Sequence, residues 1–248
     1  MDLVEAILLR KSIRAFKPDP VPTEILEEIL EAAIRAPSWA NTQPWELIVV
    51  GGETLQELKE GLRNLASEKP RPDIPSLTEY PEPYGTRRRI LGRKVLEMKG
   101  IDRKDKRGRR EWHAHMTTFF GAPHAIFLAV DRSFSQTGEY LNVWALFSCA
   151  LLAMNIALLA THHGLGTCLE AAPVAYPDLI RERLEIPDGK LMVLAIAIGY
   201  PDWDNPVNQF RSERETADGI TRWYGFGQKG GSCADDQRAG SDRRSQDP

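Results

Sequence analysis

The sequence predicts an α+β domain in which helices pack on one sheet. Two continuous apolar runs of strand length, 125–130 and 191–198, are typical of central strands covered on both faces. Between them lies a long apolar segment, 141–161, which indicates a buried helix. Strands and helices do not alternate regularly along the chain, as they would in a doubly wound fold, so one sheet with flanking helices is expected.

The composition indicates a folded protein with a polar C-terminal tail. The chain has 248 residues, of which 42% are hydrophobic and 27% charged, a balance usual for globular proteins. This length favours a single large domain, or one domain with an insertion. Residues 228–248 have almost no hydrophobic side chains and cannot offset the entropy cost of ordering. We therefore expect a folded domain over 1–227 and a disordered tail over 228–248.

The N-terminal half shows four further elements. Asp2 and Glu5 can cap a short helix that runs into Arg10, and Thr23 can cap an amphipathic helix that Pro37 stops. A β-rich run, 47–50, predicts a strand, and the apolar spacing of 54–66 predicts another helix.

The apolar segment 141–161 is long enough to cross a bilayer, which needs about 20 apolar residues. Asn142, Ser148 and Asn155 interrupt it, and the helices elsewhere are charged and amphipathic. We favour a helix buried in the core or at a subunit interface over a membrane span.

The cysteines and the N-terminus favour the cytoplasm. Cys149, Cys168 and Cys233 have no CxxC spacing, so neither a disulfide framework nor a zinc site is predicted. The histidine pairs at 113/115 and 162/163 lack a cysteine or carboxylate cluster that would complete a metal site. The first residues place an acid before the apolar run and basic residues after it, which is opposite to a secretory signal.

A cationic cluster follows the first predicted helix. Arg10, Lys11, Ser12 and Arg14 place three cations and a hydroxyl within five residues. Guanidinium groups can hold a phosphate with paired hydrogen bonds, and the hydroxyl and loop amides add donors. The cluster therefore indicates phosphate binding, although a solvated basic turn is the alternative.

A second polar segment, 35–45, reads RAPSWANTQPW. Its prolines stiffen the chain, its small polar side chains offer donors and acceptors, and Trp39 or Trp45 can pack on an aromatic face. Such a loop could present donors to a flat polar ring, or it could be a capped loop with a buried tryptophan.

Several motifs together resemble the nitroreductase family. They are RKSIRAF at 10–16, APSWANTQPWELIVV at 36–50, GLGTCLEAAP at 164–173, AIAIGYP ending at Pro201 and FRSERE starting at Phe210. The likeness spans residues 1–225 and is more specific than any single motif.

This resemblance implies an intertwined homodimer with a central, mainly antiparallel sheet and two FMN molecules at the subunit interface. Arg10, Lys11, Ser12 and Arg14 would hold FMN, with Arg211 or Arg214 from the far end of the chain. Pro37, Ser38 and Asn41 would approach from the partner subunit, and Leu169, Glu170 and Ala171 would face the reactive N5 edge. Trp39 and Trp112 are candidates on the substrate side, no side chain is expected to do the chemistry, and no metal is implied.

The implied activity is two-electron, ping-pong reduction of a nitroaromatic or related small unsaturated acceptor, with NADH or NADPH as electron donor. A reductive dehalogenase, a quinone, azo or alkene reductase, and a non-catalytic FMN-binding sensor remain alternatives.

Residues 68–110 form a variable insertion relative to this family. Residues 68–86 contain five prolines, and 87–110 contain twelve Lys and Arg against three acids. The basic part can be a solvated charged helix or an electropositive lid over the flavin. Nucleic-acid binding is disfavoured because stacking aromatics are missing from the run and the whole chain carries a net charge of −3.

Overall fold

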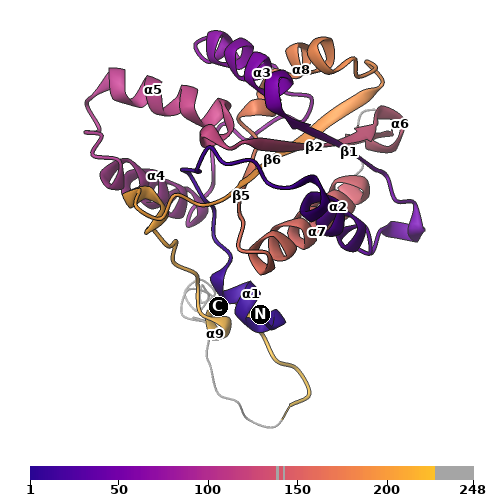
Figure 1. Cartoon of the computed structure of the whole chain (residues 1–248). Helices are drawn as coiled ribbons and strands as arrows, with labels where there is room; N and C mark the ends of the chain where they lie inside the picture. The colour runs from indigo at the N-terminus through magenta and orange to yellow at the C-terminus, as the bar shows by residue number, and fades with distance from the viewer. Residues whose placement is uncertain (138–139, 142, 227–248) are drawn as a thin grey trace, which may run out of the picture. The chain divides into compact units, whose positions relative to one another are not determined.

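The computed structural model describes residues 1–137, 140–141 and 143–226, and the chain divides into two compact units, Met1–Arg211 and Ser212–Pro248. The main sheet of the first unit is antiparallel, with four strands in the order β1-β2-β6-β5 (Figure 1). These strands are β1 (Trp45–Gly51), β2 (His124–Asp131), β5 (Gly166–Glu170) and β6 (Lys190–Gly199). The predicted α+β fold with a mainly antiparallel sheet is confirmed. The predicted tail, 228–248, lies outside the described residues.

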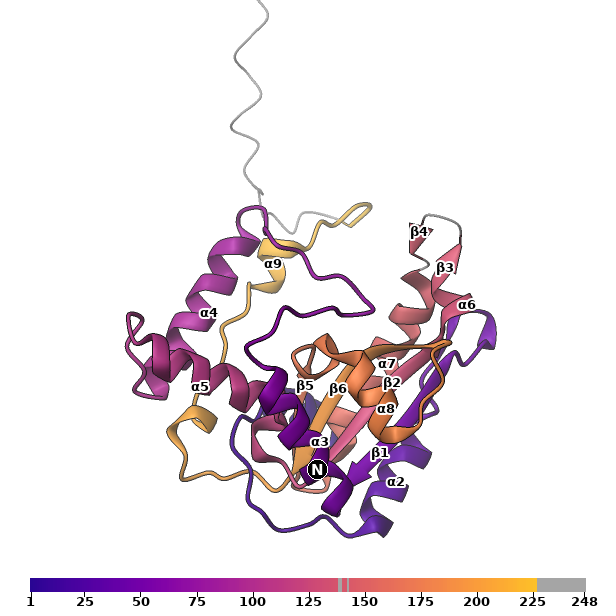
Figure 2. The same cartoon turned by 90° about the horizontal axis from the view of Figure 1, so that it is seen from above.

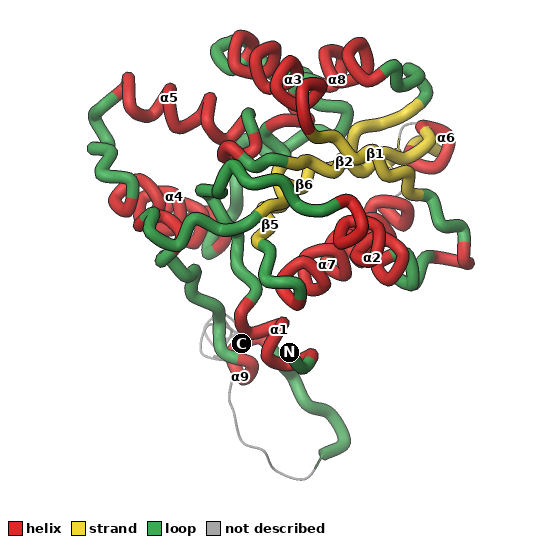
Figure 3. Tube along the Cα trace, in the orientation of Figure 1, coloured by secondary structure: helices red, strands yellow, loops and turns green. Residues whose placement is uncertain are grey.

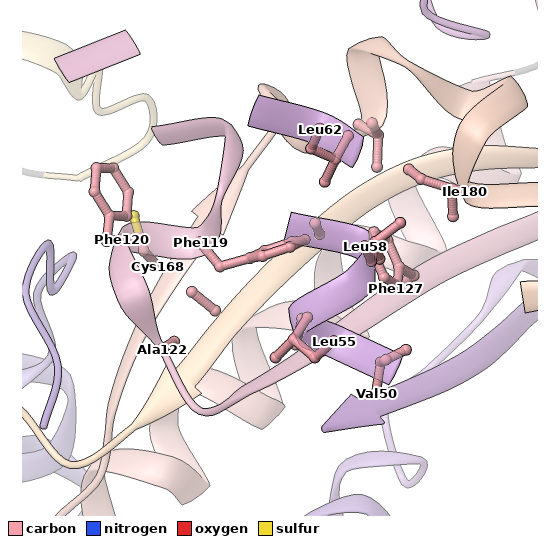
Figure 4. Packing of buried hydrophobic residues seen from close by; sticks show 14 of the residues in the cluster. Val50, Leu55, Leu58, Leu62, Phe119, Phe120, Ala122, Phe127, Cys168 and Ile180 are labelled. Carbon is pink, nitrogen blue, oxygen red and sulfur yellow. The ribbon is translucent and has the colours of Figure 1, made fainter. Parts of the chain in front are cut away.

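Helices cover both faces of this sheet, as the continuous apolar runs predict. On one face lie α3 (Gly52–Leu65) and α8 (Pro177–Leu184), and on the other α2 (Thr23–Ala33) and α7 (Val143–His162), as Figure 1 shows. Alternate residues of β2 enter opposite clusters, so Phe127 packs with α3 while Ile126 packs with α7. Figure 4 shows the first cluster, in which Leu55, Leu58 and Leu62 of α3 surround Phe127.

The N-terminal helices form as their sequence predicts, with one correction. In α1 (Leu3–Leu9), the Asp2 carboxylate accepts a hydrogen bond from the Glu5 N–H at 2.8 Å. The expected cap at Thr23 is wrong, because Thr23 is already helical and the residue before the helix is Pro22, which offers no side-chain acceptor. The backbone carbonyl of Pro22 instead accepts hydrogen bonds from backbone N–H groups of the first turn.

The basic stretch 87–110 forms most of one helix and the start of the next. These are α4 (Tyr84–Met98) and α5 (Lys106–Thr117), which stand together on the β5 side of the sheet in Figures 1 and 2. Residues 66–83 are irregular, as their prolines predict, and Figure 3 shows them as loop. They are nevertheless anchored, because the Asp73 carboxylate accepts from the Met192 N–H at 2.8 Å and pairs with Arg181.

The apolar segment that could cross a bilayer is α7. Among the described residues, α7 is the one helix that is long and apolar enough to span a membrane. Of the residues in its most apolar stretch, 44% are buried inside the protein. Its buried residues, including Leu152 and Ile156, pack against α2 and the sheet. Four further short elements are α6 (Arg132–Ser135), β3 (Gln136–Thr137), β4 (Tyr140–Leu141) and, in the second unit, α9 (Ala217–Ile220).

Candidate functional site

The cationic segment leaves α1 and runs beside the edge strand β5. Ser12 forms a parallel bridge with Thr167, and the Ile13 N–H donates to the Thr167 carbonyl at 2.9 Å. Gly166 permits this approach, because a Cβ at that position would lie 2.5 Å from the Ile13 side chain. The fold therefore joins the motifs at 10–16 and 164–173, which the sequence keeps far apart.

A short 3-10 helix, η4 (Pro206–Asn208), holds the same segment from a third part of the chain. The Arg14 N–H donates to the Asn208 side-chain oxygen at 2.8 Å, and the Asn208 amide nitrogen donates to the Ala15 carbonyl at 2.7 Å. Asn208 is fully buried. Sequence reasoning missed it, since an asparagine in a Pro-rich and Asp-rich stretch usually indicates an exposed turn.

Two cations from opposite ends of the sequence of the first unit, Lys11 and Arg211, influence each other here. Burial of the Lys11 ammonium, and secondly the charge of Arg211 nearby, lower the pKa of Lys11. Lys11 also lies over the Trp203 ring at 4.8 Å, and Arg211 donates to the Leu8 carbonyl. Like charges held together favour an anionic ligand between them. Arg214 belongs to the second unit, where it bonds locally to Ser212 at 2.6 Å.

The strand β5, beside this cluster, has two buried polar atoms without partners in the described part of the chain. The Thr167 hydroxyl and one Glu170 carboxyl oxygen make no hydrogen bond within the described chain. Glu170 is 6% exposed, and its burial raises the carboxyl pKa well above the usual value, with Arg14 opposing the shift. Orphaned polar atoms of this kind indicate a place for a ligand or water. On either side of Glu170, Leu169 and Ala171 are exposed.

Cys168, between these two orphaned groups, is an inert thiol. Its side chain is buried beside Phe120 in the core, where Figure 4 shows it. Burial, and secondly the charge of Glu170, raise the thiol pKa to about 12. Cys168 therefore acts as a small buried hydrophobe, since so little thiolate is present at neutral pH.

The loop at 37–43 lies elsewhere in the same chain. Pro37 and Asn41 are exposed, and the Ser38 hydroxyl accepts from the Gln43 N–H at 3.0 Å. The Trp39 N–H donates to Ser148, near the start of α7, at 3.3 Å. The cationic segment instead borders β5, which follows the other end of α7. Because an α-helix rises ~1.5 Å per residue, Ser148 and the C-terminal end of α7 lie ~20 Å apart along the helix axis.

The two tryptophans considered for the substrate side differ in exposure. Trp39 is 57% exposed, whereas Trp112 is only 9% exposed and belongs to the core. The Trp112 ring packs 5.4 Å from Phe120 and 5.6 Å from His115, measured between ring centroids. Trp112 is therefore a packing residue in this chain, because most of its ring is already covered.

The sequence profile of the Nitroreductase family matches residues 7–200. The chain belongs to the nitroreductase family. Its similarity extends to a 4-nitrobenzoate reductase of Pseudomonas putida, 30% identical over 91% of this chain and 96% of that protein. A nitrobenzene nitroreductase of Ectopseudomonas oleovorans is 31% identical over 81% of this chain and 87% of that protein.

A solved nitroreductase structure shares the fold along nearly the whole chain. It is the FMN-dependent nitroreductase NfnB from Mycobacterium smegmatis in complex with NADPH, which superposes with a TM-score of 0.82 at 28% identity. The match covers 90% of this chain and 100% of that one. The resemblance predicted from the motifs is thus confirmed at the level of both sequence and fold.

Proposed function

We propose that this nitroreductase is a homodimeric, NAD(P)H-dependent FMN oxidoreductase that reduces nitroaromatic acceptors by two-electron, ping-pong turnover. The observation that carries the proposal is the junction of the cationic segment with β5. There, the charge of Arg211 acts on Lys11 and lowers its pKa, and in the described part of the chain Thr167 and Glu170 each hold a buried polar atom without a partner. This donor set suits a phosphate joined to a polar ring system, which is the chemistry of FMN.

Each residue of the cluster has a role in this proposal. Arg10, Lys11, Ser12 and Arg211 bind the phosphate and the ribityl chain, and Arg14 favours negative charge at the pyrimidine edge. The backbone at 169–171 would face the N5 edge. When bound, FMN supplies the hydride chemistry, and the protein supplies orientation, electrostatics and access.

The homodimer is supported by exposed apolar side chains on two helices. On α1, Leu3 and Leu8 are 66% and 59% exposed, and on α7, Trp144 and Phe147 are 51% and 58% exposed. Single exposed apolar residues are common, but such a group on adjacent elements indicates an interface. A second copy would also bring Pro37, Ser38 and Asn41 to the cofactor, because one chain keeps them at the far end of α7.

The acceptor class is supported by the relatives and by Trp39. The similar proteins from Pseudomonas putida and Ectopseudomonas oleovorans are named as reductases of 4-nitrobenzoate and nitrobenzene. The exposed indole of Trp39, on the loop offered to the partner subunit, provides a flat apolar surface for such a ring. The cytoplasmic location stays a prediction.

The basic helices α4 and α5 form an electropositive border of the site in this proposal. α4 packs against η4, which holds the cationic segment, so the positive charge of 87–110 adjoins that of Lys11 and Arg14. Such a field attracts the phosphates of NADPH or an anionic acceptor.

Anaerobic mixing of the purified yellow protein with NADH or NADPH tests the function. We expect the flavin absorbance to bleach within seconds with at least one donor, and to recover on addition of a nitroaromatic. A stopped-flow series of nitroaromatics, quinones and halophenols against the prereduced protein then ranks the acceptors. Flavin that does not bleach would contradict the proposal in favour of a sensor, and preference for halophenols would favour a dehalogenase.

A further inference from the structure

Asn208 is a buried amide whose side-chain hydrogen-bonding groups are engaged. Its oxygen accepts from the Arg14 N–H at 2.8 Å. Its nitrogen donates one proton to the Ala15 carbonyl at 2.7 Å and the other to the Asp202 carbonyl at 2.8 Å. Both amide protons are therefore used, so the side chain has one orientation in this environment.

The backbone of Asn208 holds a second part of the cluster. Its carbonyl accepts from the Lys11 ammonium at 2.5 Å. One residue thus ties both the main chain at 14–15 and the side chain of Lys11. This matters because Lys11 lies beside Arg211, and two cations without such a tie would move apart into water.

We infer that Asn208 is a positioning residue for the FMN phosphate: it holds the cationic segment and the Lys11 ammonium in place before the cofactor binds. The inference rests on the proposed FMN function. Preorganised cations bind an anion more tightly than mobile ones, because their ordering cost is met on folding and not on binding. Asn208 touches no part of the reacting system itself and acts through the cations that it holds.

Asparagine is the residue type that fits this position. Aspartate keeps the acceptor for the Arg14 N–H but loses both protons given to Ala15 and Asp202. It also adds a negative charge beside Lys11, which would compete with a phosphate for that ammonium. Alanine removes all three side-chain hydrogen bonds without adding charge.

The test compares FMN with riboflavin, which lacks the phosphate, on apoprotein by quenching of flavin fluorescence. We expect Asn208→Asp and Asn208→Ala to weaken FMN binding roughly 10- to 100-fold and riboflavin binding less than about threefold. Asn205→Ala is the matched control. Asn205 precedes the same 3-10 helix, and its side chain accepts a longer hydrogen bond, from the Val207 N–H at 3.4 Å. We expect this variant to keep the wild-type preference for FMN.

The outcomes separate this inference from the proposed function. Wild-type protein that binds FMN no more tightly than riboflavin would contradict the phosphate site itself. A wild-type preference that persists in both position-208 variants, or an equal loss for both flavins, would overturn the role of Asn208. If neither variant folds, amide exchange in the wild-type apoprotein decides. Exchange of the Arg14 N–H as slow as in β2 supports the inference, and exchange at the rate of an exposed loop would overturn it.

Discussion

The charge of Arg211 acts on the Lys11 ammonium, although the two residues come from opposite ends of the sequence of the first unit. Burial of Lys11 lowers its ammonium pKa, and the charge of Arg211 lowers it further. Both effects make the charged form of Lys11 less favourable in the free protein. An anion that binds at these cations offsets this cost and therefore stabilises the folded protein.

Arg14→Ala should weaken FMN retention. Hydrogen bonds to charged groups contribute about 1.5–3 kcal/mol each, so the dissociation constant should rise roughly 10- to 100-fold. The flavin-to-protein absorbance ratio after gel filtration measures the loss. Lys17→Ala removes a nearby exposed cation outside the cluster and should retain full flavin content. Equal flavin content in wild type and Arg14→Ala would reject the role of Arg14.

Glu170→Gln should change how stability depends on pH. Burial raises the pKa of the Glu170 carboxyl well above 4.5 in the folded protein. At pH values between 4.5 and this raised pKa, the folded state therefore holds a proton that the unfolded state has released. Unfolding therefore releases a proton, and wild-type stability falls relative to the variant as pH rises above 4.5. Urea unfolding of both apoproteins at pH 5 and pH 8 should show the difference shifting by roughly 1 kcal/mol or more. A difference independent of pH would mean that the carboxyl is ionised.

Asp73→Asn should destabilise the protein strongly. The Asp73 and Arg181 side chains are 9% and 8% exposed, so the substitution leaves a buried guanidinium without its main counter-charge. Breaking a buried pair in this way costs about 3–5 kcal/mol. Asp178→Asn is the matched control, because Asp178 contacts the same guanidinium at 3.1 Å but is 86% exposed. Chemical unfolding should show less than about 1 kcal/mol for the control, and similar losses in both variants would contradict a special anchor at Asp73.

Neutralising the basic helices should weaken the response to NADPH. With Arg87, Arg88, Arg109 and Arg110 changed to Gln, the Michaelis constant for NADPH should rise and its salt dependence should decrease, because part of the attracting field is gone. Steady-state kinetics at low and high salt measure both quantities. The double variant Lys17→Gln with Arg183→Gln removes exposed cations elsewhere and should leave both quantities unaltered. Unchanged kinetics in the four-site variant would show that 87–110 is a solvated charged surface.

Local patterns in the sequence predicted the elements whose pattern is strong. The apolar runs at 125–130 and 191–198 became the central strands β2 and β6, and the amphipathic stripes after Asp2 and Pro22 became α1 and α2. The weaker elements were not predicted. β5 is five residues long and begins with Gly166, and α8 has only two full turns, so neither produces a clear periodicity.

The sequence by itself determined the fold class, the family and the cationic segment at 10–14, because these follow from local hydrophobic spacing and ordered motifs. Only the tertiary structure decided that Arg211 meets Lys11, that Asn208 ties the segment down, that Asp73 anchors 66–83 and that Trp112 is buried. These contacts join residues far apart in the chain, and nothing in the local sequence records which distant groups will be neighbours. They are chosen by packing of the whole core, which leaves each buried polar group with the partners that the fold brings within reach.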